Sequence, residues 1–432
     1  MIGHFFINDT LENKISYYLI ACFLITLPFD HFYSEWLLIT FCIHTVTNFK
    51  KTDFKRLKNK NIWIIASVFF LSLAAVSYSA YKSEGIKDSF QQLGILLFPA
   101  SLSVSHLNLR KYKISFLKIF AITCTGTILY LYTDAFHTIY YFHLPWSSLL
   151  KKTFINQNFS APIGLHATYL SMYAVLSISI FFYLYFKNSG KKNLKYILCI
   201  AILFAGLVQL SSRSALIASA VIFLVLVPLF LLDGKRKLSF LIISSVVSLL
   251  FIFLVTRATS FRERVINDFE NDLSEYKHPG DFLESRRMRW NLEWKLIQQS
   301  TFVGYGSGSE KFILKETYFE NKFYRSYLAE LNSHNQYLSF LLNTGIVGLM
   351  LYLFILCYGI ITALKNKDFL LMSFLAILVF VSISENILSV TKGVLFYAFF
   401  YSFFLFNIPH KIPRTKADFK IKRQPEIDLQ RL

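Results

Sequence analysis

The chain has 432 residues, of which 54% are hydrophobic and only 16% carry a charge, with a formal net charge of +19. Soluble domains usually contain about 25% charged residues. The low charge and the long apolar runs exclude a water-soluble enzyme, a secreted disulfide-stabilised domain and a disordered chain, and they indicate an all-α polytopic membrane protein.

Twelve apolar runs, separated by charged or Gly- and Pro-containing breaks, are predicted to cross the membrane as helices. They lie near residues 16–29, 35–48, 61–80, 93–107, 115–132, 167–186, 195–211, 214–232, 239–256, 336–363, 369–385 and 393–408. Because a spanning helix needs about 20 residues, this chain can hold a dozen with loops to spare. We therefore expect residues 1–432 to form a single transmembrane domain.

The basic residues predict the orientation, because short cytoplasmic loops carry more Lys and Arg than short loops on the opposite side. With the N-terminus inside, 27 of the 45 Lys and Arg lie in cytoplasmic segments and 6 in short outer loops. The main cytoplasmic segments are Lys50–Lys60, Arg110–Lys113, Lys191–Lys192, Lys235–Lys237 and the tail Lys411–Arg431. Both termini are thus expected in the cytoplasm. The net charge reflects topology and contact with membrane lipids, and no nucleic-acid partner is expected.

The remaining 12 basic residues lie with 12 Asp and Glu in one long outer loop, residues 257–334, between the ninth and tenth spans. Apolar residues between about Phe282 and Ile297 recur at helical spacing and predict an amphipathic helix on the bundle or on the outer leaflet. The outer segment 133–166 is rich in aromatic residues and is expected to lie partly in the membrane interface. The five cysteines lie in apolar runs without metal-ligand spacing, so neither a metal site nor a disulfide framework is expected.

Arg213 occupies the tight connection between the seventh and eighth predicted spans, on the outer side. An arginine in this position can extend to lipid headgroups. It can also present a fixed guanidinium that pairs with two phosphate oxygens. Both interpretations fit the local sequence.

A second basic cluster consists of Arg286, Arg287 and Arg289, and the run Gly304–Gly308 follows it. A basic run is usually a solvated face, and three arginines within four residues cannot all point the same way on a helix. We therefore expect one or two of them to serve a site. The glycines permit a tight turn or a close backbone approach, but no Lys-Ser/Thr follows in the frame of a P-loop.

His334 lies between Ser333 and Asn335, directly before the tenth span. This segment can be a simple helix start, with Ser333 or Asn335 as the cap. Alternatively, a histidine at the mouth of a span can accept a proton near neutral pH. His166 opens the sixth span from the same side and is a second histidine candidate.

Three short motifs occur in a fixed order. Ser212-Arg213 lies between two spans, Arg286-x3-Trp290 is followed fourteen residues later by Gly304-x-Gly306, and His334–Leu338 is followed after six residues by Gly345–Gly348. They resemble the S/T-R, R-x3-W/Y…G-x-G and H-N-x-x-L-x6-G-x-x-G elements of the O-antigen ligase/polymerase superfamily. The resemblance covers about residues 150–400, whereas the first 150 residues match only as hydrophobic spans.

The resemblance implies a metal-independent membrane glycosyltransferase with a GT-C-like helical fold and no cofactor. Such enzymes take a glycan from an undecaprenyl-pyrophosphate carrier at the periplasmic face of the bacterial inner membrane and pass it to an acceptor hydroxyl. The ligase uses the lipid A-core of lipopolysaccharide as acceptor. The polymerase extends the carrier-linked glycan instead, and a third relative glycosylates protein serines.

A transfer of this kind needs positive charge for the departing pyrophosphate and a group that takes the proton of the acceptor. We expect Arg213 and Arg286 to bind the pyrophosphate and His334 to act as the base, in a single displacement with inversion. His334 could instead bond a phosphate oxygen. Further candidates for substrate binding are Arg289, Arg287, His166 and Asn335.

The twelve-span layout and the mixed charges of residues 261–273 favour the ligase over the polymerase. A transporter or flippase, from a different class, would place ionisable residues at mid-membrane and break its helices in two related halves. The predicted spans are instead nearly free of charge, and Glu385 stands at a span end.

Overall fold

The computed structural model describes residues 7–29, 31–187, 194–257, 262–263, 267–274 and 284–408. Within these ranges every regular element is helical and no strand occurs, which confirms the all-α prediction. Several segments used in the sequence predictions lie outside the described residues: Lys191–Lys192, the tail from Lys411, Phe282, and residues 261 and 264–266 of the mixed-charge segment.

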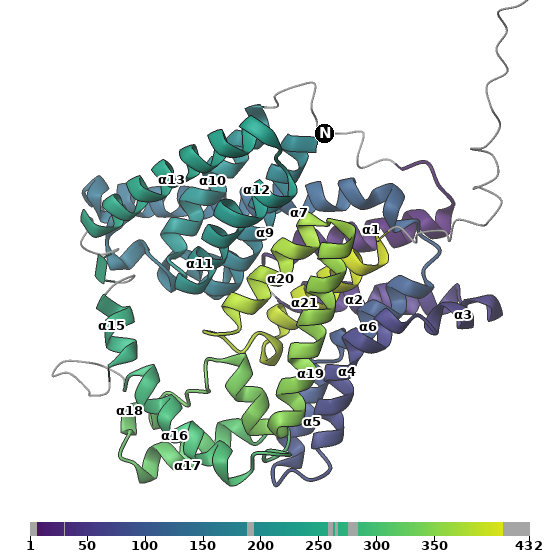
Figure 1. Ribbon diagram of the computed structural model, residues 1–432, viewed down its shortest axis with the longest axis vertical. Helices are drawn as coiled ribbons and strands as arrows, with labels where there is room; N and C mark the ends of the chain where they lie inside the picture. Colours follow the sequence, from purple (N-terminus) through teal and green to yellow (C-terminus); the bar gives the residue numbers. More distant parts are fainter. Residues whose placement is uncertain are drawn as a thin grey trace, which may run out of the picture.

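The helices are connected mostly by short turns (Figure 1). In chain order they are α1 (Leu11–Thr26), α2 (His31–Thr47), α3 (Phe54–Leu57), α4 (Lys60–Ala75), α5 (Lys82–Gln91), α6 (Gly94–Val104), α7 (Leu109–Tyr141), α8 (Gln157–Ser160), α9 (Ala167–Lys187), α10 (Leu194–Leu210), α11 (Arg213–Val221), α12 (Val227–Phe230), α13 (Gly234–Arg257), α15 (Asp268–Leu273), α16 (Arg286–Gln299), α17 (Glu310–Glu320), α18 (Tyr324–Leu328), α19 (Gln336–Asn366), α20 (Phe369–Val381) and α21 (Thr391–Phe406).

Each of the twelve apolar runs coincides with a helix, or with the joined pair α11 and α12. Among the described residues, four helical segments are long and apolar enough to cross a membrane, namely α7, α9, Arg213–Phe230 and α19. That all twelve cross it stays a prediction. The helix boundaries differ most at α7, which continues to Tyr141 instead of 132. A smaller difference, at α20, concerns the site, because this helix ends at Val381 instead of 385.

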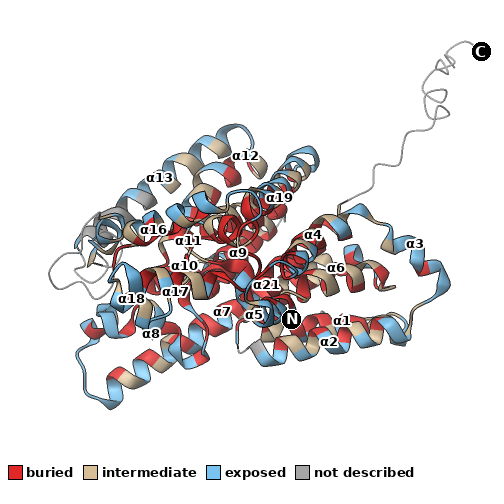
Figure 2. Ribbon diagram, turned by 90° about the horizontal axis from the view of Figure 1, so that it is seen from below, coloured by how far each residue is buried: buried red, intermediate tan, exposed pale blue. Residues whose placement is uncertain are grey.

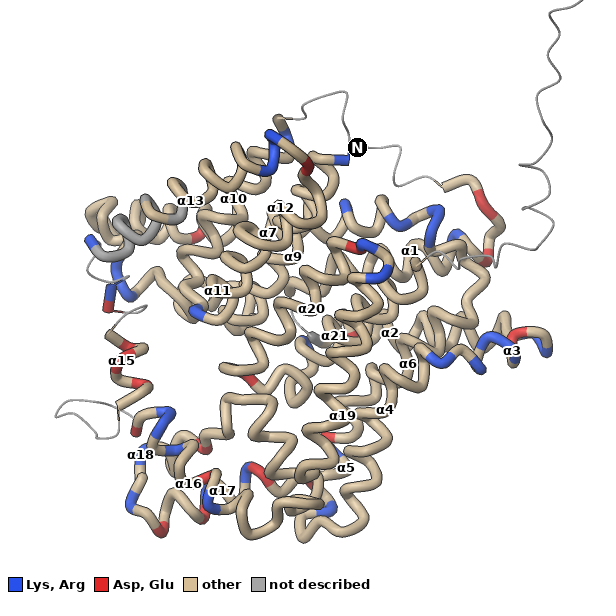
Figure 3. The backbone as a smooth tube through the Cα atoms, viewed as in Figure 1, with Lys and Arg blue, Asp and Glu red and all other residues tan. Residues whose placement is uncertain are grey.

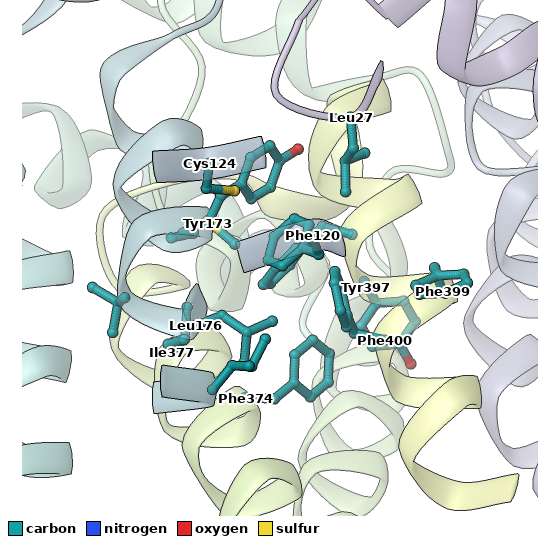
Figure 4. Packing of buried hydrophobic residues seen from close by; sticks show 14 of the residues in the cluster. Leu27, Phe120, Cys124, Tyr173, Leu176, Phe374, Ile377, Tyr397, Phe399 and Phe400 are labelled. Carbon is teal, nitrogen blue, oxygen red and sulfur yellow. The ribbon is translucent and has the colours of Figure 1, made fainter. Parts of the chain in front are cut away.

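The centre of the bundle is formed by α9 and α21. Every residue from 167 to 181 in α9 and from 392 to 405 in α21 is buried, as expected for helices that are apolar on all sides. Figure 2 shows this buried centre, with exposed residues on the surrounding helices. Aromatic rings fill the contacts between helices, for example Phe120 of α7 and Phe400 of α21, whose ring centroids are 4.7 Å apart (Figure 4).

The predicted outer loop contains helices of its own. Figure 1 shows α16, α17 and α18 together with α5 at the end of the molecule away from α10, α12 and α13. The amphipathic helix expected near 282–297 is present as α16, but its buried residues include Arg289 and Glu293 beside Leu292 and Ile297. This helix packs on α17 and α19 through a surface that contains both apolar and ionisable residues.

The glycine motifs hold this outer part against the bundle. Helix α19 is broken at Gly345, which has φ 64° and ψ −160°. The break leaves carbonyl groups without helical partners, and the backbone N–H groups of Tyr305 and Gly306 donate to Leu342 and Asn343, each at 2.8 Å. A Cβ added at Gly345 would lie 2.2 Å from the carbonyl oxygen of Phe302. The Gly304-x-Gly306 motif and the motif that contains Gly345 are far apart in the sequence, and they are thus joined by backbone hydrogen bonds.

We predict that Gly345→Ala strongly destabilises the protein. Its φ and ψ are accessible essentially only to glycine, which alone costs about 1–3 kcal/mol for another residue, and the backbone clash adds to this. Gly126→Ala in α7 is the matched control: a Cβ there meets nothing within 4 Å, so helix propensity predicts a gain of up to about 1 kcal/mol. Unfolding temperatures of the detergent-solubilised variants measure the difference. Equal stability of the two variants would contradict the proposed contact.

Candidate active site

The turn that follows α20 brings four other segments together. The carbonyl oxygen of Ser384 accepts a hydrogen bond from Arg286 Nη1 at 3.2 Å, and the hydroxyl of Ser384 donates to Ser214 Oγ at 2.7 Å. The next residue, Glu385, contacts His334 and Thr168. The first turns of α9, α11 and α16 and the connection before α19 therefore meet at Ser384 and Glu385.

Arg213 and Arg286 converge on a single carboxylate. Arg213 Nη2 donates to Asp272 Oδ2, and Arg286 Nε lies 3.5 Å from the same oxygen. Arg213 also lies over the ring of Phe269, at 5.6 Å from its centroid. Its Nη1 is buried and has no hydrogen-bond partner among the described residues. Two guanidinium groups with one shared carboxylate leave positive charge and donor capacity that suit a bound anion.

His334 and Glu385 form a second pair beside the arginines. His334 Nδ1 lies 3.4 Å from Glu385 Oε2, and Thr168 Oγ1 donates to the other carboxylate oxygen at 3.3 Å. Burial alone would raise the pKa of Glu385, but His334, His166 and Arg286 together lower the pKa below its usual value. Glu385 is thus held as a carboxylate, which can orient an imidazole and stabilise its protonated form.

The sequence prediction did not include Glu385 or Asp272 in the site. Glu385 was assigned to the end of a span, whereas the helix ends at Val381 and the residue turns inward toward His334. The sequence signal that could have indicated Glu385 is a carboxylate at the end of an otherwise charge-free span. Asp272 lies on the short helix α15, and nothing in the sequence distinguishes it from the other acidic residues of that segment.

The other predicted site residues diverge. Arg287 is exposed on α16, and Arg289, with 5% of its surface exposed, points into the interior near Glu293 and Tyr318. Asn335 is buried and caps α19, accepting from the N–H groups of residues 337 and 338. His166 is exposed directly before α9, close enough to Glu385 to lower its pKa. Arg286 contacts the turn after α20 through its hydrogen bond to Ser384.

A layer of carboxyl groups lies behind His334. The hydroxyl of Ser333 contacts Glu293 Oε1 at 2.5 Å and Glu310 Oε1 at 2.7 Å. Burial and the neighbouring charge of Glu310 raise the pKa of Glu293 to about 8. Glu293 therefore carries a proton at neutral pH. Within the described part of the chain, no group of three or more His, Cys, Asp or Glu side chains is arranged to hold a metal ion.

Residues 198–353 match the family model described as O-antigen ligase. This match supports the O-antigen ligase/polymerase superfamily as the family that the chain resembles. The sequence resemblance is thereby confirmed. The match includes Arg213, Arg286 and His334, whereas His166 and Glu385 lie outside it. Among curated proteins, none is similar enough to count as a relative. The superfamily and the apolar helices together identify a membrane protein.

The raised pKa of Glu293 predicts a pH-dependent stability. Between the ordinary pKa of 4.5 and the folded value of about 8, the folded protein keeps a proton that the unfolded chain releases. The stabilisation from this group is therefore fully present below pH 4.5 and is lost as the pH rises through 8. Glu293→Gln removes the dependence, so its unfolding temperature should rise relative to the wild type between pH 5 and pH 8.5.

The difference corresponds to a few kcal/mol at most, since one pKa unit is worth about 1.4 kcal/mol. Glu320→Gln, an exposed Glu on α17, serves as the control and should show no such trend. A difference between Glu293→Gln and wild type that stays constant with pH would contradict a buried neutral acid at this position.

Proposed function

We propose that this protein is an O-antigen ligase. It would transfer a glycan from undecaprenyl-pyrophosphate to the lipid A-core of lipopolysaccharide at the periplasmic face of the bacterial inner membrane. One observation carries this proposal: Arg213 and Arg286 converge on Asp272 directly beside the pair of His334 and Glu385. A cationic site for a diphosphate thus adjoins a proton acceptor.

In the proposed reaction, the diphosphate of the carrier displaces Asp272 from the two guanidinium groups. The acceptor hydroxyl attacks the anomeric carbon, and the bond to the phosphate oxygen breaks on the opposite face, which inverts the configuration. The pyrophosphate leaves with the bonding electron pair, stabilised by Arg213 and Arg286. His334 takes the hydroxyl proton. Since its Nδ1 faces Glu385, Nε2 is the nitrogen available for the acceptor, which favours His334 as base over His334 as phosphate ligand.

Arg289 is buried behind Arg286 and Arg287 is exposed, so their proposed part in substrate binding is secondary. His166 would contact the substrate from the start of α9. Asn335 would support the substrate site indirectly, by fixing the start of α19, because its side-chain oxygen caps this helix. In this proposal the chain needs no metal and no cofactor.

We propose that both termini lie in the cytoplasm, that residues 257–334 lie in the periplasm and that all twelve apolar segments cross the membrane. The basic starts of α7 and α13 lie at the end of the molecule away from α16–α18, as this orientation requires (Figure 3). A reporter that is fluorescent only in the cytoplasm should be active after Leu432 and inactive when inserted between α17 and α18. The opposite result would reverse the topology and move the site to the cytoplasmic side.

Deletion of the gene should leave full-length glycan on the carrier and bare lipid A-core. A polymerase, which shares the donor chemistry, would instead leave core bearing a single repeat unit. In the complemented strain, Arg213→Ala and Arg286→Ala should each lower the transfer rate about 10²–10³-fold, and His334→Ala about 10²–10⁴-fold. Gel analysis of lipopolysaccharide and transfer by the purified protein provide the two measurements.

The matched controls are Arg325→Ala and His137→Ala, because both side chains are exposed and lie on α18 and α7, outside the segments that meet at Ser384 and Glu385. They should retain transfer at equal expression. Activity in all three site variants would refute the site. Transfer by purified protein without an ion gradient would exclude a transporter or flippase, and single-repeat core after deletion would assign the chain to the polymerases.

A further inference from the structure

Glu310, the first residue of α17, accepts hydrogen bonds from several parts of the chain. Its Oε1 accepts from the backbone N–H of Ser333 at 3.0 Å, from the Ser333 hydroxyl at 2.7 Å and from Asn386 Nδ2 at 2.9 Å. Its Oε2 accepts from Asn343 Nδ2 at 3.0 Å and from the hydroxyl of Ser339. The side chain is buried, with 8% of the residue exposed. All of these partners donate, as an ionised carboxylate requires.

The partners of Glu310 flank the reactive pair. Ser333 immediately precedes His334, and Asn386 immediately follows Glu385. Asn386 in turn accepts from the backbone N–H of Asn335 at 2.7 Å. One carboxylate therefore links the chain before His334 to the chain after Glu385, although it touches neither of these two side chains in the contacts described above.

His334 needs such support because its backbone is strained. Its φ is 46°, in the left-handed region that residues other than glycine adopt rarely. Residues in this region are strained and persist only where the surroundings fix them. The hydrogen bonds of Ser333 and Asn335 fix the backbone on both sides of His334.

Glu293 completes this arrangement on the other side of Ser333. A hydroxyl has a single proton, so Ser333 cannot donate to both Glu293 and Glu310. Because Glu293 is a neutral acid, it donates to Ser333 Oγ, and Ser333 then donates to Glu310. The carbonyl of Ser333 accepts from Trp290 Nε1 at 2.8 Å. Ser333 is thus held by three groups of α16 and α17.

We infer that Glu310 is a positioning residue of the transferase: through Ser333 and Asn386 it holds His334 and Glu385 within hydrogen-bond distance of each other. The inference rests on the proposed function, and it goes beyond it by assigning a role to a group that contacts neither donor nor acceptor. Glu310 acts on the proton transfer, and none of its hydrogen bonds described above is to Arg213, Arg286 or Asp272.

Glu310→Gln is the first test. The amide has nearly the same size as the carboxylate. Its NH2 group faces hydrogen-bond donors whichever way the side chain is turned, so the hydrogen bonds to one of the two former carboxylate oxygens are lost. We expect kcat to fall about 10–100-fold, because a displacement of about 1 Å in a catalytic group can cost 10²-fold. The KM for the carrier-linked donor should stay unchanged. Transfer by purified protein, with the unfolding temperature as a check on folding, measures both constants.

A double-mutant cycle separates positioning from general damage. In the Glu385→Gln background the carboxylate partner of His334 is already lost, so its position relative to His334 no longer affects the rate. Adding Glu310→Gln should then lower kcat less than about 3-fold. A merely structural role would reduce the active fraction by the same factor in both backgrounds. That result, or a wild-type rate in Glu310→Gln alone, would overturn the inference.

Asn386→Ala and Asn343→Ala form a matched pair that does not alter the carboxylate. Both substitutions remove one amide donor to Glu310, but of the two residues only Asn386 is adjacent to Glu385 in the chain. Asn386→Ala should lower kcat about 10-fold, and Asn343→Ala should keep it within about 3-fold. Equal loss in the two variants would contradict the inference. A wild-type protein that transfers no glycan would refute the proposed function. This outcome is distinct from a failure of the Glu310 inference, which is judged only from variants compared with an active wild type.

Discussion

Ionisable groups at the edge of an apolar helix bundle are costly unless they are paired, and the pairing of these groups determines how the site is assembled. The cations Arg213 and Arg286 come from different helices and share Asp272. His334 is matched by Glu385. Each pair joins segments that are distant in the sequence, so the charges can be neutralised only when α11, α15, α16, α19 and the turn after α20 are in place. The same interactions that stabilise these segments also form the candidate active site.

Backbone geometry sets the position of the outer helices relative to that site. The break of α19 at Gly345 exposes carbonyl groups, and the loop that contains Gly304 and Gly306 binds them through its own N–H groups. This contact places α17, and with it Glu310, beside the first turn of α19. The glycines of the superfamily motifs thus have a structural function here: they bring a buried carboxylate next to the strained backbone of His334.

The two layers of the site differ in chemistry. The layer that would face the substrate under the proposed function contains cations and an imidazole, which suit a diphosphate and an acceptor hydroxyl. The layer behind it contains Glu310 and the neutral acid Glu293, which lies on the same buried side as Arg289. Burial makes their hydrogen bonds strong and an unpaired group costly, so this inner layer is suited to fix geometry and the outer layer to bind and react.

The sequence alone determined the helical class, the location of the apolar segments, the superfamily and the candidates Arg213, Arg286 and His334, because these follow from local composition and from motifs of a few adjacent residues. It did not reveal Asp272, Glu385 or Glu310. A carboxylate acquires its role from the partner it meets: Asp272 meets Arg213 at a separation of 59 residues, Glu385 meets His334 at 51 and Glu310 meets Asn343 at 33. It also predicted that one or two of Arg286, Arg287 and Arg289 serve the site, and the structure places the three side chains in different environments. Only the tertiary structure decided these pairings, since burial and distance are properties of the packed chain.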